Sequence, residues 1–294
     1  MMAWLSQPLM LLDGATGTEL GRRGVDISLP LWSAHAIIEA PDVLAEIHRD
    51  YLLAGADAIT ANTFRTHRRS LSKVELAGRA RELTRQAVAI AAQARDRFKP
   101  QALVLGSVAP LEDCYRPELA PDAAVCRDEH AEMIENLLNS GVDGILIETQ
   151  NNLREAEAAA EQARRLAPGR WMISFCTTSE GPPGMLLSGE SLADVLPALE
   201  GASAVGVNCV AATSTESQVK LLRLLVPHHV RISAYANVSK ACADGSWIAT
   251  DAVDPENYAQ YAARWIAAGA TIIGGCCGTR PEMINRIASR LAAK

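Results

Sequence analysis

The chain has 294 residues, of which 49% are hydrophobic and 21% are charged, so it can bury a core and is not a disordered chain. Only 4% of the residues are aromatic, which leaves Ala, Leu, Ile and Val to fill that core. The net charge of −6 argues against a nucleic-acid-binding protein, which would need a basic surface.

Eight short runs are rich in hydrophobic and β-branched residues. Several of them are hydrophobic at successive positions, which is typical of strands buried on both faces of a parallel sheet. In chain order, the predicted strands are Leu9–Leu12, Ala58–Ala61, Leu103–Ser107, Gly144–Glu148, Trp171–Cys176, Ala204–Asn208, Ile232–Ala236 and Thr271–Gly275.

Segments of Ala, Leu, Glu and Arg with helical spacing separate these strands. Proline marks the first position of three predicted helices, at Pro41, Pro255 and Pro281, and the first two end at Gly55 and Gly269. The other predicted helices are Glu75–Arg97, Glu129–Ser140, Leu153–Leu166, Ser191–Glu200 and Thr215–Leu225.

Strand and helix alternate about eight times without a linker of different composition. This alternation predicts an α/β fold, a (β/α)8 TIM barrel that forms a single domain over residues 1–294. A doubly wound open sheet is the alternative, but no strand is followed by the G-x-G-x-x-G turn that would favour it.

The chain shows no signal for a membrane or for secretion. The longest apolar run, Trp265–Cys277, is too short to span a bilayer, and the amino terminus lacks a basic segment before its apolar residues. Seven cysteines, an odd number, disfavour a disulfide framework. We therefore expect a reducing, cytoplasmic location, with thiolate or metal chemistry as the use of the cysteines.

The residues that follow each strand are the candidates for chemistry, because a parallel barrel places its site at the carboxyl ends of its strands. Three of the seven cysteines fall there. Cys209 ends the sixth strand, while Cys276 and Cys277 follow the eighth, where Gly274, Gly275 and Gly278 allow a sharp turn.

Three thiolates with no fourth ligand of obvious type describe a catalytic zinc site with an open position. The alternative is that the adjacent cysteines are small buried hydrophobic residues.

Two carboxylates occupy comparable positions. Glu148 ends an apolar strand and faces the barrel mouth, where it can bind an ammonium group or act as a base, and Asp13 precedes the glycine-rich loop GATGTELGRRG. That loop lacks the G-K-[ST] ending of a phosphate-binding loop and is expected to turn backbone N–H groups toward a carboxylate. The six histidines have no metal-binding spacing, and we assign none of them a catalytic role.

Five motifs together resemble the zinc-dependent homocysteine S-methyltransferases, a family that includes the betaine and S-methylmethionine enzymes and the homocysteine module of cobalamin-dependent methionine synthase. The motifs are DGATGTEL, AGADAITANTF, DGILIET, GVNC and GGCCGTRPEMI, and the similarity extends from about Leu11 to Ile287.

The resemblance implies a barrel that binds one Zn²⁺ through Cys209, Cys276 and Cys277, with Glu148 and Asp13 near the amino group of L-homocysteine. Asn237 matches a position where the family commonly has YPN, and its side-chain oxygen could fill the open metal position until the substrate sulfur displaces it. Ala236 replaces the proline of that pattern. Further candidate substrate contacts are Gly14, Thr16 and Asn208.

The implied reaction transfers a methyl group to the zinc-bound thiolate of homocysteine and yields L-methionine. The donor is expected to be a free sulfonium or quaternary ammonium, with S-methylmethionine first and S-adenosylmethionine or betaine next. Aromatic faces suit such a cation. Trp32 and Phe64 are the first candidates, and Tyr115 and Trp247 are further ones.

Three alternatives stay open at this point. The chain could be a homocysteine-activating subunit that receives the methyl group from a separate corrinoid protein. It could be a zinc- or thiol-binding protein without turnover, or a different barrel enzyme, for example a hydrolase, whose cysteine pair is structural. We expect no membrane partner, and a homo-oligomer is possible.

Overall fold

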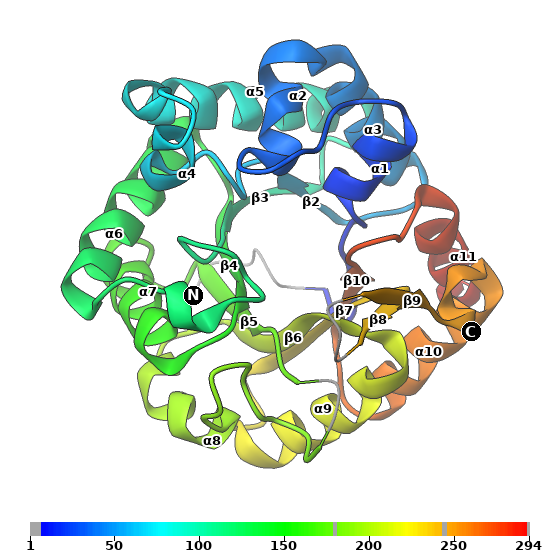
Figure 1. The fold of residues 1–294 in the computed structure, drawn as a ribbon. Coiled ribbons are helices and arrows are strands. Elements are labelled where there is room, and N and C mark those ends of the chain that lie inside the picture. Colours follow the sequence, from blue (N-terminus) through cyan, green and yellow to red (C-terminus); the bar gives the residue numbers. More distant parts are fainter. Residues whose placement is uncertain (1–6, 179–180, 243–245, 293–294) are drawn as a thin grey trace.

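The structure is a computed structural model, and it describes residues 7–178, 181–242 and 246–292. Eight parallel strands form one sheet that curves into a barrel surrounded by helices (Figure 1). In spatial order they are β1 (Met10–Leu11), β10 (Ile272–Gly275), β7 (Arg231–Asn237), β6 (Ala204–Ala211), β5 (Trp171–Phe175), β4 (Gly144–Gln150), β3 (Leu103–Val108) and β2 (Ala58–Ala61).

A single bridge between Leu12 and Ala58 joins the two ends of this sheet, so the barrel is nearly closed. The predicted (β/α)8 fold is confirmed, and each observed strand lies within a few residues of its prediction.

The longer helices that cover the barrel agree with the predicted ones, but several begin elsewhere. Helix α6 starts six residues before the predicted start because the carboxylate of Asp122 caps the backbone N–H groups of Ala124 and Val125, both at 3.0 Å. Their bounds are α3 (Pro41–Leu53), α5 (Ala80–Phe98), α6 (Ala123–Ser140), α7 (Leu153–Leu166), α9 (Ala212–Leu225), α10 (Pro255–Ala267) and α11 (Pro281–Ala292).

Two predicted helices are shorter or split. Helix α5 begins at Ala80 rather than Glu75, because Glu75 has a positive φ of 62° and a 3-10 turn precedes the helix. The segment predicted as a helix over Ser191–Glu200 has Ser191 as its N-cap, the short helix α8 (Leu192–Val195) and then a 3-10 turn that contains Pro197.

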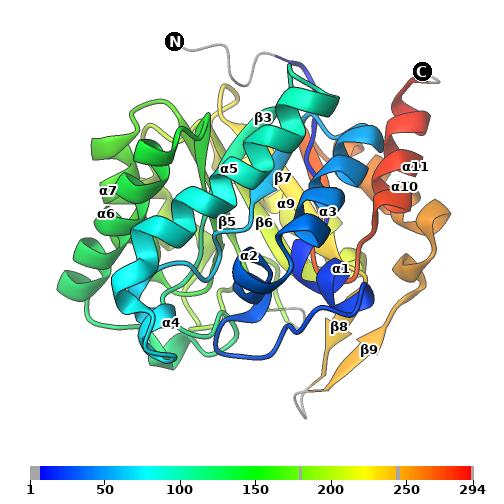
Figure 2. The same ribbon diagram turned by 90° about the horizontal axis from the view of Figure 1, so that it is seen from above.

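Four short elements were not predicted. They are α1 (Thr16–Arg22), α2 (His35–Glu39), α4 (Arg68–Ser72) and an antiparallel hairpin of β8 (Ser239–Ala241) and β9 (Trp247–Ala249). The hairpin projects from the end of the barrel opposite to the one where helix α11 ends (Figure 2). All four are too short to show a clear hydrophobic period.

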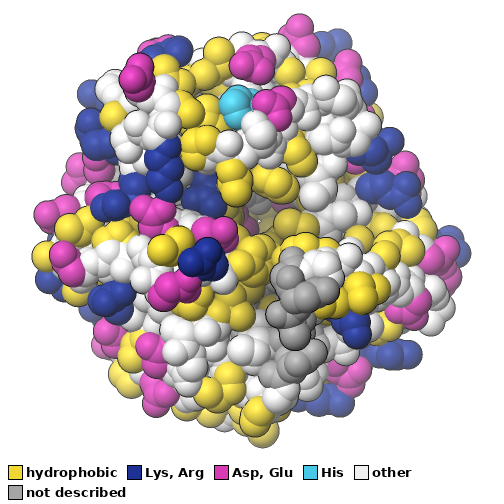
Figure 3. Space-filling model, in the orientation of Figure 1, with side chains coloured by type: hydrophobic (Ala, Val, Ile, Leu, Met, Phe, Trp, Pro, Cys, Tyr) yellow, Lys and Arg dark blue, Asp and Glu magenta, His cyan; other side chains and the backbone are white. Residues whose placement is uncertain are grey.

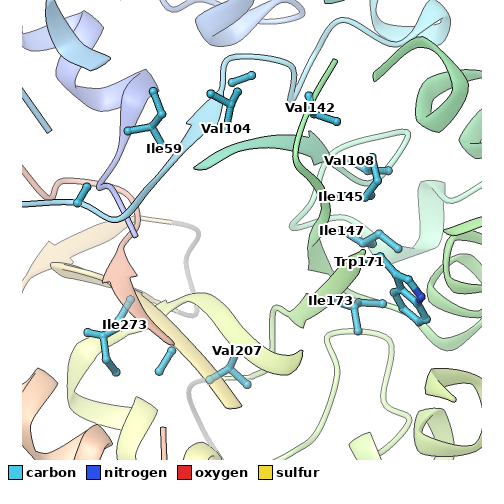
Figure 4. Packing of buried hydrophobic residues seen from close by; sticks show 14 of the residues in the cluster. Ile59, Val104, Val108, Val142, Ile145, Ile147, Trp171, Ile173, Val207 and Ile273 are labelled. Carbon is cyan, nitrogen blue, oxygen red and sulfur yellow. The ribbon is translucent and has the colours of Figure 1, made fainter. Parts of the chain in front are cut away.

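Two hydrophobic layers hold the fold together. The larger one lies between the strands and the helices, and Figure 4 shows members such as Ile59, Ile147 and Ile273 directed away from the barrel axis. The smaller one fills the barrel interior and includes Leu105, Leu146 and Met172. Residues that alternate along a strand therefore serve the two layers in turn.

The inward-facing positions change from hydrophobic to polar toward the carboxyl ends of the strands. Leu105 is followed two residues later by Ser107, Leu146 by Glu148, and Met172 by Ser174. The hydrophobic plug thus forms the floor beneath a polar layer, and this polar layer faces the barrel mouth.

Within the described residues, no helix is both long enough and apolar enough to cross a membrane. Residues 1–6, on which the expected absence of a secretion signal rests, lie outside the described part of the chain.

Candidate functional site

A cavity of about 570 Å³ opens at the carboxyl ends of the strands. Figure 3 looks onto this mouth and shows hydrophobic side chains around a central hollow. Ten of the predicted site residues line the cavity, namely Asp13, Gly14, Thr16, Trp32, Phe64, Glu148, Cys209, Asn237, Cys276 and Cys277.

The three predicted metal ligands meet in this cavity. The sulfur atoms of Cys209, Cys276 and Cys277 lie within 4.8 Å of one another, and the first two are 2.9 Å apart. The sulfurs of one tetrahedral ion with Zn–S bonds of about 2.3 Å lie about 3.8 Å apart. The cluster thus has the size of a zinc ligand set, with Cys209 and Cys276 closer to each other than a bound ion would hold them. Their softness as donors also fits zinc better than magnesium or calcium.

The local backbone explains how these side chains come together. Cys209 has a positive φ of 55°, and the pairing of β6 with β7 shifts register between Asn208 and Ala211. A positive φ is uncommon for a residue with a side chain and marks a strained, deliberate turn. At the other side, Gly275 has no room for a Cβ, which would lie 2.3 Å from the Thr279 hydroxyl.

Asn237 connects the two cysteine segments. Its Nδ2 donates to the Cys209 carbonyl at 2.9 Å, and its Oδ1 accepts from the Cys277 backbone N–H at 3.0 Å. The two ends of the Asn237 amide therefore hold the backbone at Cys209 and at Cys277 in place. The expectation that its oxygen occupies the open metal position stays a prediction.

The thiols form a polarised cluster. Hydrogen bonds from Cys276 and Cys277 lower the pKa of Cys209 well below its ordinary value, and the same bonds raise the pKa of the two donors. One sulfur thus carries negative charge readily, which suits a site for a cation.

The two predicted carboxylates are buried in the wall of the same cavity. Desolvation raises the pKa of Asp13 to about 7, and that of Glu148 to about 8. Asp13 accepts from the backbone N–H of Thr60 at 2.7 Å and from its hydroxyl at 3.1 Å, and Glu148 accepts from the Ser107 hydroxyl. An ammonium group placed between them would stabilise both in the charged form.

Asn208 differs from the expectation. Its side chain is fully buried, lies outside the cavity lining, and bonds only within the barrel. Its Oδ1 accepts from the Thr149 backbone N–H at 2.9 Å and from the Ser174 hydroxyl at 2.7 Å, while its Nδ2 donates to the Thr149 hydroxyl at 2.8 Å. We assign it a positioning role instead of substrate contact.

The glycine-rich loop is tied to the cysteine loop. The backbone N–H of Ala15 donates to the Thr279 hydroxyl at 3.0 Å, and that of Gly278 donates to the Thr18 hydroxyl at 2.9 Å. Gly14 has no space for a side chain, because a Cβ there would lie 2.8 Å from Tyr51 and from Thr279. Part of the expected N–H cradle is thus used to fix the loop.

All four candidate aromatic residues line the cavity. The indole of Trp32 lies against Gly17, where a Cβ would come within 2.3 Å of its Nε1. Tyr115 meets Trp247 of the hairpin edge-to-face, with ring centroids 5.1 Å apart. Together they give the mouth apolar, π-rich walls.

The sequence interpretation missed several polar residues of the cavity, among them Arg65, Ser107 and Tyr235. Ser107 and Tyr235 lie at inward-facing positions on strands, so the two-residue period could have indicated them. Arg65 comes four residues after the end of β2 and offered no such signal. Cys114 also lines the cavity.

Comparisons with known proteins agree with this geometry. Residues 10–291 match the family model described as homocysteine S-methyltransferase. A homocysteine S-methyltransferase of Escherichia coli is 32% identical over 300 residues, which cover 97% of this chain and 96% of that protein. A methionine synthase of Mycobacterium tuberculosis is 34% identical, but this chain spans 25% of its length.

Among solved structures, the metallated form of the E. coli homocysteine methyltransferase MmuM superimposes with a TM-score of 0.83 at 31% identity, over 98% of both chains. The family match covers nearly the whole described chain, and full-length relatives exceed 30% identity. The chain is a methyltransferase and belongs to the homocysteine S-methyltransferase family.

Proposed function

We propose that the protein transfers a methyl group from a free cationic donor to the zinc-bound thiolate of L-homocysteine and so forms L-methionine. The observation that carries this proposal is the meeting of three cysteine sulfurs and two buried carboxylates in one cavity. A thiol-containing amino acid presents the complementary groups, a sulfur for the metal and an ammonium for the carboxylates.

The metal would be held by Cys209, Cys276 and Cys277. Zn²⁺ bound there lowers the pKa of the substrate thiol, of which only a few per cent is ionised at neutral pH when it is free. All-thiolate ligation leaves more electron density on the attacking sulfur than imidazole ligation would, which suits alkyl transfer.

The protein's own groups would orient the acceptor. Asp13 and Glu148 would bind its ammonium group, and Asn237 keeps the cysteine segments in register through its two backbone contacts. Holding sulfur and methyl carbon in line can contribute about 7 kcal/mol or more to the lowering of the barrier. Positioning is therefore the main task of the barrel.

The donor would enter along the aromatic side of the mouth. Trp32, Phe64, Tyr115 and Trp247 offer faces to a sulfonium or quaternary ammonium, whose charge disappears as the methyl group leaves. S-Methylmethionine is the first expected donor, and S-adenosylmethionine and betaine follow. The cytoplasm is the predicted compartment, because free thiolates persist under reducing conditions.

The proposal is tested by an assay for methionine that contains zinc-loaded protein, homocysteine and one of the three donors, without any corrinoid protein. Methionine formed from a free donor supports it. Methionine formed only after a methylated corrinoid protein is added would identify the chain as an activating subunit. Stoichiometric zinc with no methionine under either condition would identify a binding protein.

A further inference from the structure

The only cationic side chain among the described residues that line the cavity is Arg65. It follows β2 and is 7% exposed. It forms no ion pair with any described residue, whereas Arg68 pairs with Glu132 and Arg69 with Glu129. A buried guanidinium without a counter-ion is costly, so its presence in a ligand cavity needs an explanation.

The guanidinium is also underused as a hydrogen-bond donor. Nη1 donates to the Glu112 carbonyl at 2.9 Å, Nε is buried with no partner, and Nη2 makes no hydrogen bond within the described part of the chain. The guanidinium carbon, Cζ, lies 5.3 Å from the Phe64 ring centroid, so the ring lies against one face of the group. A planar fork with free donors is suited to a carboxylate.

Arg65 and the thiols face the same space. Burial and the nearby Cys209 raise the pKa of the Cys114 thiol, while Arg65 acts to lower it. Cys114 thus lies within electrostatic reach of both, in the wall of one cavity. The cavity therefore offers three thiols that can hold a metal ion, to which a substrate sulfur would bind. It also offers two carboxylates for an ammonium group and one guanidinium for an anion.

We propose that Arg65 binds the carboxylate of an amino-acid substrate and makes the enzyme select substrates that carry one. This inference rests on the proposed function, since it names what else that site recognises. The carboxylate can come from the thiol acceptor or from the methyl donor, and the two sources are separable by experiment.

The experiment compares each substrate with an analogue that lacks only the carboxylate. For the acceptor, L-homocysteine is compared with 3-aminopropanethiol, and for the donor, S-methylmethionine with its decarboxylated sulfonium. KM and kcat are measured for the wild type, Arg65→Gln and Arg65→Lys. Calorimetric binding of the two thiols to the zinc-loaded protein provides a readout that needs no turnover.

Arg69→Gln is the matched control. Arg69 lies four residues further along the chain and holds the same loop through Glu112 and Glu129, but it does not line the cavity. It reports what a loosened loop does to the reaction without a change of charge in the cavity. Melting temperatures of all variants show whether the fold is kept.

In one of the two pairs, we expect Arg65→Gln to raise KM for the substrate that carries the carboxylate about ten- to hundredfold, because a charge-assisted hydrogen bond is lost. The KM for the analogue without the carboxylate and the kcat values should change little. Arg65→Lys should recover part of the loss. The pair that shows this effect identifies whether Arg65 binds the carboxylate of the acceptor or that of the donor.

Equal losses for a substrate and its analogue, or the same losses in Arg69→Gln, would overturn the inference. A wild type that binds homocysteine but transfers no methyl group contradicts the proposed function alone, and binding data still decide the role of Arg65. A wild type that binds neither substrate overturns both.

Discussion

At the scale of single residues, Glu148 has the most consequential environment. Its folded-state pKa of about 8 lies above the ordinary value of 4.5 because the carboxyl is desolvated. Between these values the folded chain holds a proton that the unfolded chain has lost. The free energy of unfolding therefore falls as pH rises through this range.

Glu148→Gln should consequently stabilise the ligand-free protein at pH 8.5 and change it little at pH 5, where the wild-type carboxyl is already neutral. A rise in melting temperature of roughly 2–4 °C per kcal/mol is expected at the higher pH. The same variant should raise KM for homocysteine about ten- to hundredfold, because an ion-paired hydrogen bond is lost.

Thermal melts at the two pH values and steady-state kinetics check this prediction. Glu161→Gln, on the exposed surface of α7, is the control that should change neither quantity. A Glu148→Gln variant with unchanged KM would remove Glu148 from the substrate site.

Residue types at strand ends made much of the site predictable. Cys209, Cys276, Cys277, Glu148 and Asp13 were all indicated by position and chemistry, and the cavity brings them together. Arg65 was not, because a charged residue in a loop carries no sign of whether it is buried. Asn208 was predicted to contact the substrate, but its side chain is buried outside the cavity lining, which no local sequence pattern reports.

At the scale of elements, strands β4 and β6 share an unusual ending. Thr149 and Cys209 both have positive φ, 61° and 55°, and each interrupts the register with a neighbouring strand. Asn208 joins the two turns, since it bonds both backbone and hydroxyl of Thr149 and directly precedes Cys209. The Asn208 side chain thereby aligns the strand end that carries Glu148 with the strand end that carries Cys209, a predicted metal ligand.

Asn208→Ala should leave the Thr149 N–H unsatisfied and destabilise the fold by about 1–3 kcal/mol. Because the turn at Cys209 loses its support, zinc affinity should also fall about 10- to 100-fold, as for other residues that orient metal ligands. Competition with a chromogenic chelator measures the affinity, and denaturant unfolding measures the stability.

Asn139→Ala, at an exposed position of α6, serves as the comparison. If Asn208→Ala lost stability but kept wild-type zinc affinity, Asn208 would support the barrel only and would not position the ligand.

The bounds of the strands followed from hydrophobic runs, but the two turns that end β4 and β6 did not. The bond that stabilises them joins residues 59 positions apart. Helix starts were missed where a side-chain cap decides them, as at Asp122, and the β8–β9 hairpin was missed because β9 is exposed along its whole length.

At the scale of the whole molecule, we expect the fold to be stable independently of the predicted metal site. The layer between strands and helices contains none of the three cysteines, and of the three only Cys276 packs against the plug inside the barrel, from its edge. The barrel should therefore stand without its metal, unlike small domains that fold only when zinc binds.

Cys276→Ala should abolish zinc binding and methyl transfer while the chain keeps its circular dichroism spectrum. Its cooperative melt should lie within roughly 5 °C of that of the chelator-treated wild type, since most single substitutions cost about 1–2 kcal/mol. Cys126→Ala, remote from the cavity lining, is the control and should retain one zinc per chain. An unfolded Cys276→Ala chain, or one with full activity, would contradict this separation.

The junction of β1 with β2 has one further consequence. Apart from the Leu12–Ala58 bridge, it is fastened by Asp13, whose N–H donates to the Ala58 carbonyl at 3.0 Å and whose carboxylate accepts from the Thr60 N–H at 2.7 Å. If Asp13 binds the substrate ammonium as proposed, the same carboxylate also holds the two ends of the barrel sheet together. A bound amino acid would then compete with Thr60 for the oxygens of Asp13, and the hydrogen-exchange rate of the Thr60 amide should report whether the site is occupied.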